Sequence, residues 1–356
     1  MTKEKRNTII RFSYIGATIL VIALIMVFNE DFHNVPEVIA GLNPLWMLGA
    51  VGCLLVYWLT DGWLLHDITS YMSPTKMNFG KSFKIGLIGL YYCALTPSAS
   101  GGQPVQVAYM AREKVKVGTG TCVVVIKFIA YALTCIIFYL VSLAFLNEYY
   151  LTNYTAMYWL SFLGFIIMII AVAIVILSIA NRTWILKLGN GIITLFSEKI
   201  KAIKNPDSAR ESFEKTIRDY GEAGKYIIKH KARAVGSLLI SLLNIGFLFA
   251  ITYFIYRGFN LNTESFPMVM MLQALLYSAI NYFPTPGGAG MSESGFYIVM
   301  QAFFPDAFVF AAMIIWRIFT YYLILIVGSL IVVIDQFAEM KKKKNITSED
   351  LIQKNK

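Results

Sequence analysis

Charged residues and metal-binding side chains are scarce in this sequence. Only 15% of its 356 residues are charged, 57% are hydrophobic, and the mean hydropathy is +0.62. An ordinary globular protein has about 25% charged and about 45–50% apolar residues. The three histidines are scattered, and the four cysteines lie in apolar stretches without a CxxC pair. The composition therefore excludes a soluble protein and argues against a disulfide framework or a His/Cys metal site.

Catalytic signatures are also missing. The sequence has no HExxH, GxSxG or Walker A motif. Asp61, His66 and Asp67 form a lone cluster, and such a trio is more often an interface than a metal site. We predict no catalytic residue, no metal ligand and no cofactor. This favours a protein that is not an enzyme. The net charge of +10 is expected to reflect topology and anionic lipid, with no nucleic-acid partner.

Long apolar runs are what the sequence has instead. A helix needs roughly 20 apolar residues to cross the hydrocarbon core. The predicted full spans, about six in all, are residues 12–28, 44–65, 119–146, 157–180, 234–256 and 307–334. The first is interpreted as an uncleaved helix, because Asn29-Glu30-Asp31 follows it in place of a cleavage site. We therefore predict an all-α polytopic membrane protein that forms a single integral membrane domain over residues 1–356.

Two further apolar segments are broken by proline and glycine. Segment 83–111 is interrupted by Thr96–Pro104, and segment 266–304 is interrupted by Pro284–Gly290. The first arm, 83–97, would be only about 22 Å long as a helix, against a core of about 30 Å. We predict two re-entrant hairpins of opposite orientation. The halves that contain them, 1–180 and 234–335, would then form an inverted repeat, as in many transporters.

The basic residues predict the orientation of the chain. Of the 31 Lys and Arg residues, 28 fall in the N-terminus, residues 66–84, 112–116, 182–233 and the C-terminal tail, whereas loops 29–43 and 147–156 have none. Cytoplasmic loops carry such an excess. Both termini are therefore predicted to be cytoplasmic in a multi-pass cell-membrane protein. Residues 181–233 are predicted to be an amphipathic cytoplasmic linker, and 336–356 a basic cytoplasmic tail.

The two broken tips are the predicted substrate-binding site. Non-helical backbone at membrane depth is tolerated only where it is buried in protein or lines a wet cavity. The second half-helices would begin at Gln103–Pro104 and Met291, so their N-termini could bind an anion. The alternative is that proline and glycine merely end ordinary helices. The candidate residues at the tips are Gly101, Gly102, Gln103, Gln106, Pro286, Gly287, Gly288, Gly290 and Ser292.

Ionisable residues inside the predicted spans complete the candidate site. Lys127 and Arg317 follow the two glycine pairs at similar distances, and each needs a counter-charge or a ligand within the bilayer. Glu293 could pair with Arg317 as a structural salt bridge, or could stabilise the half-helix N-terminus. Asp61 is a candidate partner for Lys127, although snorkelling to the membrane surface could satisfy that lysine alone. A structural role and a substrate-binding role both remain open.

Three motifs resemble the flippase-like family, the integral membrane domain of the lysylphosphatidylglycerol synthases. The motifs are Leu95-Thr96-Pro97-(x)4-Gly102-Gln103-Pro104, Pro284-Thr285-Pro286-Gly287-Gly288-Ala289-Gly290-Met291-Ser292-Glu293, and Arg317-x-x-Thr320-Tyr321-Tyr322 with Gly328. The second motif is specific and the first is loose. The family commonly has arginines where this chain has Gln106 and Lys127. Lysine binds phosphate as a point charge and not bidentately.

The resemblance implies lipid translocation. Such a chain would move an anionic phospholipid, such as aminoacylated phosphatidylglycerol, or an isoprenoid-phosphate-linked lipid across the cytoplasmic membrane. The alternative is the membrane part of a phosphatidylglycerol lysyltransferase system, which gives resistance to cationic peptides and would need a separate lipid-modifying synthase. A scaffold without transport is a third class. The expected partner is accordingly a phospholipid or polyprenyl-phosphate lipid; the oligomeric state is not predicted.

The predicted topology can be tested by labelling single cysteines in a cysteine-free background. In intact cells a membrane-impermeant maleimide should label positions 34, 153 and 262, and should not label positions 7, 205 and 345. Asn78 and Gly118 flank the first hairpin, so cysteines at both should stay unlabelled. Labelling of one and not the other would make segment 83–111 an ordinary span.

Overall fold

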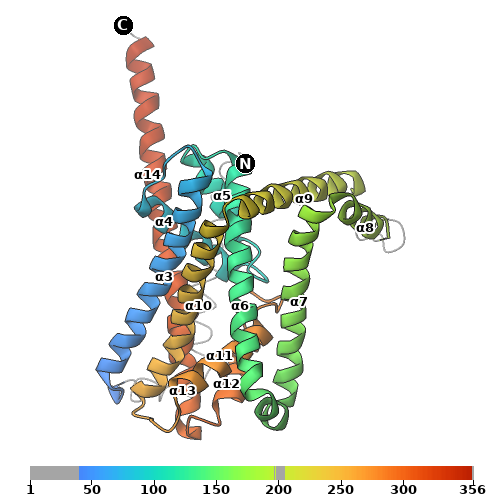
Figure 1. Ribbon diagram of the computed structural model, residues 1–356. Coiled ribbons are helices and arrows are strands. Elements are labelled where there is room, and N and C mark those ends of the chain that lie inside the picture. The colour runs from blue at the N-terminus through green and yellow to red at the C-terminus, as the bar shows by residue number, and fades with distance from the viewer. Residues whose placement is uncertain (1–39, 196, 198–204, 355–356) are drawn as a thin grey trace.

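The computed structural model describes residues 40–195, 197 and 205–354, and this part of the chain is built from helices (Figure 1). The helices are α3 (Pro44–Met72), α4 (Phe79–Leu95), α5 (Gly102–Arg112), α6 (Val117–Asn153), α7 (Thr155–Ala180), α8 (Arg182–Thr194), α9 (Pro206–Lys229), α10 (Lys231–Gly258), α11 (Phe266–Ile280), α12 (Met291–Met300), α13 (Asp306–Arg317), a π-helical turn η3 (Ile318–Tyr322) and α14 (Leu323–Lys354). The prediction of an all-α polytopic membrane protein is confirmed.

Five helical stretches among the described residues are long and apolar enough to cross a membrane. They are α3, α6, α7, α10 and the continuous stretch Asp306–Ala338. These are five of the six predicted spans; the other, 12–28, lies outside the described residues. Most helices run past the predicted bounds, as α3 does from residue 65 to Met72. Hydropathy marks only the part of a helix inside the hydrocarbon, whereas the backbone hydrogen bonds continue beyond it.

The first broken segment forms a hairpin of α4 and α5 whose two ends lie together. Lys84 at the start of α4 and Arg112 at the end of α5 both pair with the carboxylate of Asp335 on α14, Arg112 at 3.2 Å. Lys81 and Glu113 form a second ion pair between the same two ends. The chain therefore enters and leaves this hairpin at one end of the bundle, as predicted for a re-entrant segment.

The second broken segment forms a hairpin of α11 and α12 at the opposite end of the bundle (Figure 1). Both of its ends pack against the last turns of α10. The ring of Tyr253 lies 5.0 Å from that of Phe266 at the start of α11. The ring of Tyr256 lies 5.5 Å from that of Phe304, just beyond α12. This hairpin also returns to the end from which it came.

The tips of the two hairpins meet. Pro97 and Pro286 lie opposite each other in an isolated antiparallel bridge, although they are far apart in the sequence. The prediction of two oppositely oriented hairpins is confirmed. The division of the whole chain into two halves related as an inverted repeat stays a prediction.

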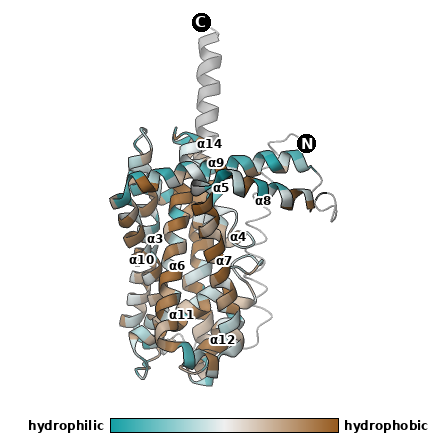
Figure 2. Ribbon diagram, turned by 45° about the vertical axis from the view of Figure 1, so that its right-hand side comes forward, coloured by the Kyte–Doolittle hydropathy of each residue, from teal (hydrophilic) through white to brown (hydrophobic). Residues whose placement is uncertain are grey.

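The described part of the linker contains two helices, α8 and α9, at the end of the bundle that also carries the basic loops (Figure 1). Figure 2 shows hydrophilic residues gathered on α9 and hydrophobic residues along α6 and α7. Ile217 and Ala223 of α9 are buried, whereas Trp184, Leu188 and Ile192 form an exposed apolar stripe on α8. The amphipathic character predicted for the linker is therefore present in both helices.

Candidate functional site

A cavity of about 370 Å³ lies between the two hairpin tips and the surrounding spans. Eight of the twelve predicted site residues line it: Gly102, Gln103, Gln106, Lys127, Gly287, Gly288, Ser292 and Arg317. The other four, Gly101, Pro286, Gly290 and Glu293, lie beside it in the same two tips. The two broken segments and both intramembrane cations therefore converge on one site.

The second tip turns through glycines in left-handed conformations. Gly287, Gly288 and Gly290 have φ values of +60°, +66° and +85°, which other residues rarely adopt. A Cβ placed on Gly287 would lie 2.0 Å from the ring of Tyr321. The Tyr321 hydroxyl, in turn, donates to the carbonyl oxygen of Ala94 at 3.4 Å. Tyr321 thus contacts both hairpins, and Gly287 provides the space for its ring.

The first tip turns through residues other than glycine. Ser98 and Ala99 carry the positive φ values, 50° and 54°, whereas Gly101 has φ −81°. Gly101 and Gly102 therefore do not provide the left-handed conformations of this turn. Gly102 is required for packing: a Cβ on it would lie 2.2 Å from Cys93 Sγ and 2.7 Å from the Gly89 carbonyl oxygen. The small residues bring α4 and α5 together below a strained turn.

Arg317 is held at the second tip by Glu293, as the salt-bridge alternative proposed. Its Nε donates to Glu293 Oε1 at 2.6 Å, and its Nη1 donates to the Gly287 carbonyl oxygen at 3.1 Å. Glu293 Oε2 accepts the backbone N–H of Gly290 at 2.8 Å. The N-terminus of α12 is therefore capped by Glu293, a carboxylate of the chain itself. This capping role was one of the alternatives that the sequence offered for Glu293.

Arg317 nevertheless has one donor that makes an ion pair without a hydrogen bond beside the cavity. Its Nη2 lies 2.6 Å from Glu293 Oε1 within the ion pair, and this atom has no hydrogen-bond partner among the described residues. The neighbouring Trp316 Nε1 is likewise buried without a described partner. An unsatisfied buried donor costs about 1–3 kcal/mol. Arg317 and Trp316 both line the cavity, so an acceptor bound there could satisfy them.

Lys127 pairs with Asp61, the partner considered from the sequence. Its Nζ lies 2.7 Å from Oδ1 and 2.8 Å from Oδ2 of that carboxylate. The side chains are 15% and 7% exposed, respectively. The pair joins α6 to α3 and lines the cavity. Snorkelling is therefore not how this lysine is satisfied, because its ammonium group is turned inward to a carboxylate.

A hydrogen-bonded group of polar residues forms another wall. The hydroxyls of Tyr131 and Tyr277 lie 3.0 Å apart, and Asn281 donates to Tyr131. Asn281 directly precedes the second tip in the sequence. The two tyrosines carried no such signal, since aromatic residues are frequent in membrane helices and only the packing of α6 against α11 brings them together. They are functional candidates that sequence reasoning missed.

Asn244 and Gln273 bridge neighbouring helices. Asn244 Nδ2 donates to the Tyr57 carbonyl oxygen at 2.7 Å, and Gln273 Oε1 accepts from Thr252 Oγ1 at 3.0 Å. Both residues also line the cavity. Buried amides in a membrane domain commonly form such bridges, so their structural role does not exclude contact with a ligand.

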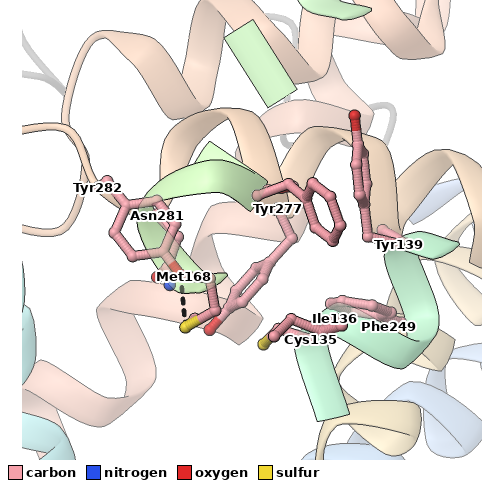
Figure 3. Close-up of a pocket in the computed structure, with 11 residues that line it drawn as sticks. Cys135, Ile136, Tyr139, Met168, Phe249, Tyr277, Asn281 and Tyr282 are labelled. Carbon is pink, nitrogen blue, oxygen red and sulfur yellow. Dashed lines mark hydrogen bonds between the residues drawn. The ribbon is translucent and has the colours of Figure 1, made fainter. Parts of the chain in front are cut away.

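A second, much smaller cavity of about 10 Å³ adjoins the wall that contains Tyr277 and Asn281 (Figure 3). Its lining comes from α6, α7, α10 and α11, and includes Tyr277, Asn281 and Tyr282, which also line the large cavity. The Tyr282 hydroxyl donates to Met168 Sδ at 3.2 Å (Figure 3). This space approaches only the size needed for one water molecule, so the large cavity is the candidate binding site.

The two ion pairs should differ in their contribution to stability. Lys127→Gln leaves the Asp61 carboxylate buried without a charge partner, which costs about 3–5 kcal/mol. Arg317→Gln should cost less, because Glu293 keeps the Gly290 N–H and its side chain is 29% exposed. Thermal unfolding in detergent should therefore show the larger loss for Lys127→Gln.

The matched double variants Asp61→Asn with Lys127→Gln, and Glu293→Gln with Arg317→Gln, should recover most of each loss. Equal losses of thermal stability in Lys127→Gln and Arg317→Gln would contradict this account of the pairs. A double variant that is less stable than the corresponding single variant would contradict it as well.

The chain is similar in sequence to known membrane proteins. The family model described as the lysylphosphatidylglycerol synthase TM region matches residues 14–328. A UPF0104 membrane protein of Archaeoglobus fulgidus is 23% identical over 325 residues, which cover 88% of this chain and 93% of that protein. The residues matched by the family model include both hairpins and both cations, Lys127 and Arg317. The chain therefore belongs to the lysylphosphatidylglycerol synthase TM region family.

Proposed function

We propose that this protein moves a phosphate-bearing membrane lipid from one leaflet of the cell membrane to the other. One observation carries the proposal: Arg317, a buried arginine whose Nη2 makes an ion pair but no hydrogen bond among the described residues, lines a cavity where two broken helices meet inside the membrane domain. Arginine and lysine are the usual ligands of phosphate in proteins. Glycine and serine of the second tip would add close backbone and hydroxyl contacts. The twelve residues predicted from the sequence are proposed to bind or frame this headgroup.

The walls of the cavity favour a lipid over a free anion. Apolar side chains of several spans line it beside the polar groups, among them Leu90, Ile245, Leu248, Ile280 and Phe283. A headgroup could occupy the polar part while its chains remain in hydrocarbon. The substrate class is therefore an anionic phospholipid, such as aminoacylated phosphatidylglycerol, or an isoprenoid-phosphate-linked lipid. Both termini are proposed to face the cytoplasm.

The alternative function is the membrane part of a phosphatidylglycerol lysyltransferase system. The description of the matching family favours it. In that role the cavity would hold the lipid for a separate synthase, and the result would be lysylphosphatidylglycerol and resistance to cationic peptides. Transport comes first in our proposal because two oppositely oriented broken helices meet at the cavity, an arrangement found in many secondary transporters.

Reconstitution into liposomes tests the proposal. The purified protein should move headgroup-labelled phosphatidylglycerol or a polyprenyl phosphate between leaflets without a covalent change, as checked by mass spectrometry. Arg317→Gln removes a charged hydrogen-bond donor and should slow translocation about 10–100-fold. Arg257→Gln is the matched control, because Arg257 stacks on Trp46 at 4.5 Å, outside the cavity lining.

An Arg317→Gln variant as fast as the parent would contradict a headgroup role for this arginine. Lysylated lipid formed from charged tRNA by this chain alone would reverse the order of the two functions.

A further inference from the structure

The carboxylates at the cavity are already engaged by groups of the chain. Among the described residues that line the cavity, Asp61 is the one carboxylate, and both of its oxygens lie within 2.8 Å of Lys127 Nζ. Glu293, beside the cavity, pairs with Arg317 and accepts the Gly290 N–H. An ammonium group that entered the cavity would find no free carboxylate among these residues and would meet two cations. The lining therefore disfavours a positively charged headgroup.

Two uncharged side chains of the lining are buried without a hydrogen-bond partner. Gln106 of α5 is 5% exposed, and its amide makes no hydrogen bond within the described part of the chain. This amide packs on α4 at Gly89, where a Cβ would lie 2.1 Å from Gln106 Nε2. Trp316 Nε1 is the second such group. Buried polar groups normally have a partner in the protein or in bound water, so these two indicate a ligand that supplies one.

Two further amides of the lining are hydrogen-bonded at one end only. Asn244 Nδ2 donates to the Tyr57 carbonyl oxygen and to Thr60 Oγ1, whereas its Oδ1 accepts nothing from the described residues. Gln273 Oε1 accepts from Thr252, whereas its Nε2 donates to none of them. The lining thus offers both free donors and free acceptors. Hydroxyl groups match this set because each can donate and accept, whereas an ammonium group can only donate.

Resting on the proposed function, we propose that the phosphate of the transported lipid carries an uncharged, hydroxyl-rich substituent, glycerol or a sugar, and that aminoacylated lipids are excluded. The phosphate lies at Arg317, whose Nη2 makes no hydrogen bond among the described residues. The hydroxyls of the substituent bind the amides of α5, α10 and α11 and the indole N–H of Trp316. The cavity of about 370 Å³ falls within the range of about 300–1,000 Å³ that is typical of small-molecule sites, which leaves room for both parts.

Titration calorimetry on the purified full chain in detergent tests this assignment. The probes are the dihexanoyl forms of phosphatidylglycerol, phosphatidylinositol, phosphatidylmethanol and lysyl-phosphatidylglycerol, each below its micelle concentration. Phosphatidylmethanol has the same phosphodiester charge but no hydroxyl on its headgroup. We expect phosphatidylglycerol or phosphatidylinositol to bind at least about tenfold more tightly than phosphatidylmethanol, the gain from one or two hydrogen bonds. Lysyl-phosphatidylglycerol should bind more weakly than phosphatidylglycerol by a similar factor. A preference for glycerol or for inositol identifies the kind of substituent, and either one supports the proposal.

Gln106→Met replaces the free amide by an apolar side chain of similar length. In this variant most of the difference in affinity between phosphatidylglycerol and phosphatidylmethanol should disappear. Gln301→Met is the matched control and should keep the difference, because Gln301 is exposed and lies outside the cavity lining. If thermal unfolding shows that Gln106→Met does not fold, Trp316→Phe removes the indole N–H, keeps an aromatic ring and should reduce the same difference.

Equal affinities of the parent protein for phosphatidylglycerol, phosphatidylinositol and phosphatidylmethanol would overturn the hydroxyl-rich substituent and leave the proposed function standing. Lysyl-phosphatidylglycerol that binds as tightly as phosphatidylglycerol would overturn the exclusion of aminoacylated lipids. A difference that persists in both Gln106→Met and Trp316→Phe would overturn the assignment of the hydroxyls to this lining. No binding of any of the four lipids would overturn the proposed function as well.

Discussion

Backbone at membrane depth must have its polar groups shielded from hydrocarbon, and the rest of this structure depends on how that is achieved. Two helices break within the bundle, and each break exposes peptide groups that a helix would have paired. The tips lie against each other at Pro97 and Pro286, and prolines carry no N–H to satisfy. Tyr321 then joins the two hairpins through its ring and hydroxyl. Each break is thus covered partly by the other.

The meeting of the two tips also leaves a cavity in which charged side chains can be buried. Because the tips do not fill the space between the spans, polar groups gather around a cavity, and two cations can be held there by carboxylates of the chain. The pairs reduce the cost of burying Lys127 and Arg317. They are not equivalent, since Glu293 also caps a helix, whereas Asp61 pairs with Lys127 and makes no other hydrogen bond among the described residues.

Much of this arrangement could be predicted from the sequence, because hydropathy, proline, glycine and basic residues act locally. They were sufficient for the spans, the hairpins, Lys127 and Arg317. Contacts made only in three dimensions were missed, such as Tyr131 with Tyr277. The first tip shows a second limit of prediction from the sequence. Ser98 and Ala99 adopt φ values that favour glycine, while the nearby glycines allow close packing of helices. Residue type indicates that a turn is present, but the packing decides which residue makes it.

Cross-linking of the two tips tests the central claim, that the broken helices meet inside one membrane domain. Residues opposite in an antiparallel pair have Cα atoms about 4.5–5.5 Å apart, which suits a disulfide. In a cysteine-free background, Pro97→Cys with Pro286→Cys should form a disulfide in native membranes, seen as linked peptides by mass spectrometry. Gly118→Cys with Pro286→Cys should not. Two reduced thiols at positions 97 and 286 after oxidation, in a folded protein, would contradict the account.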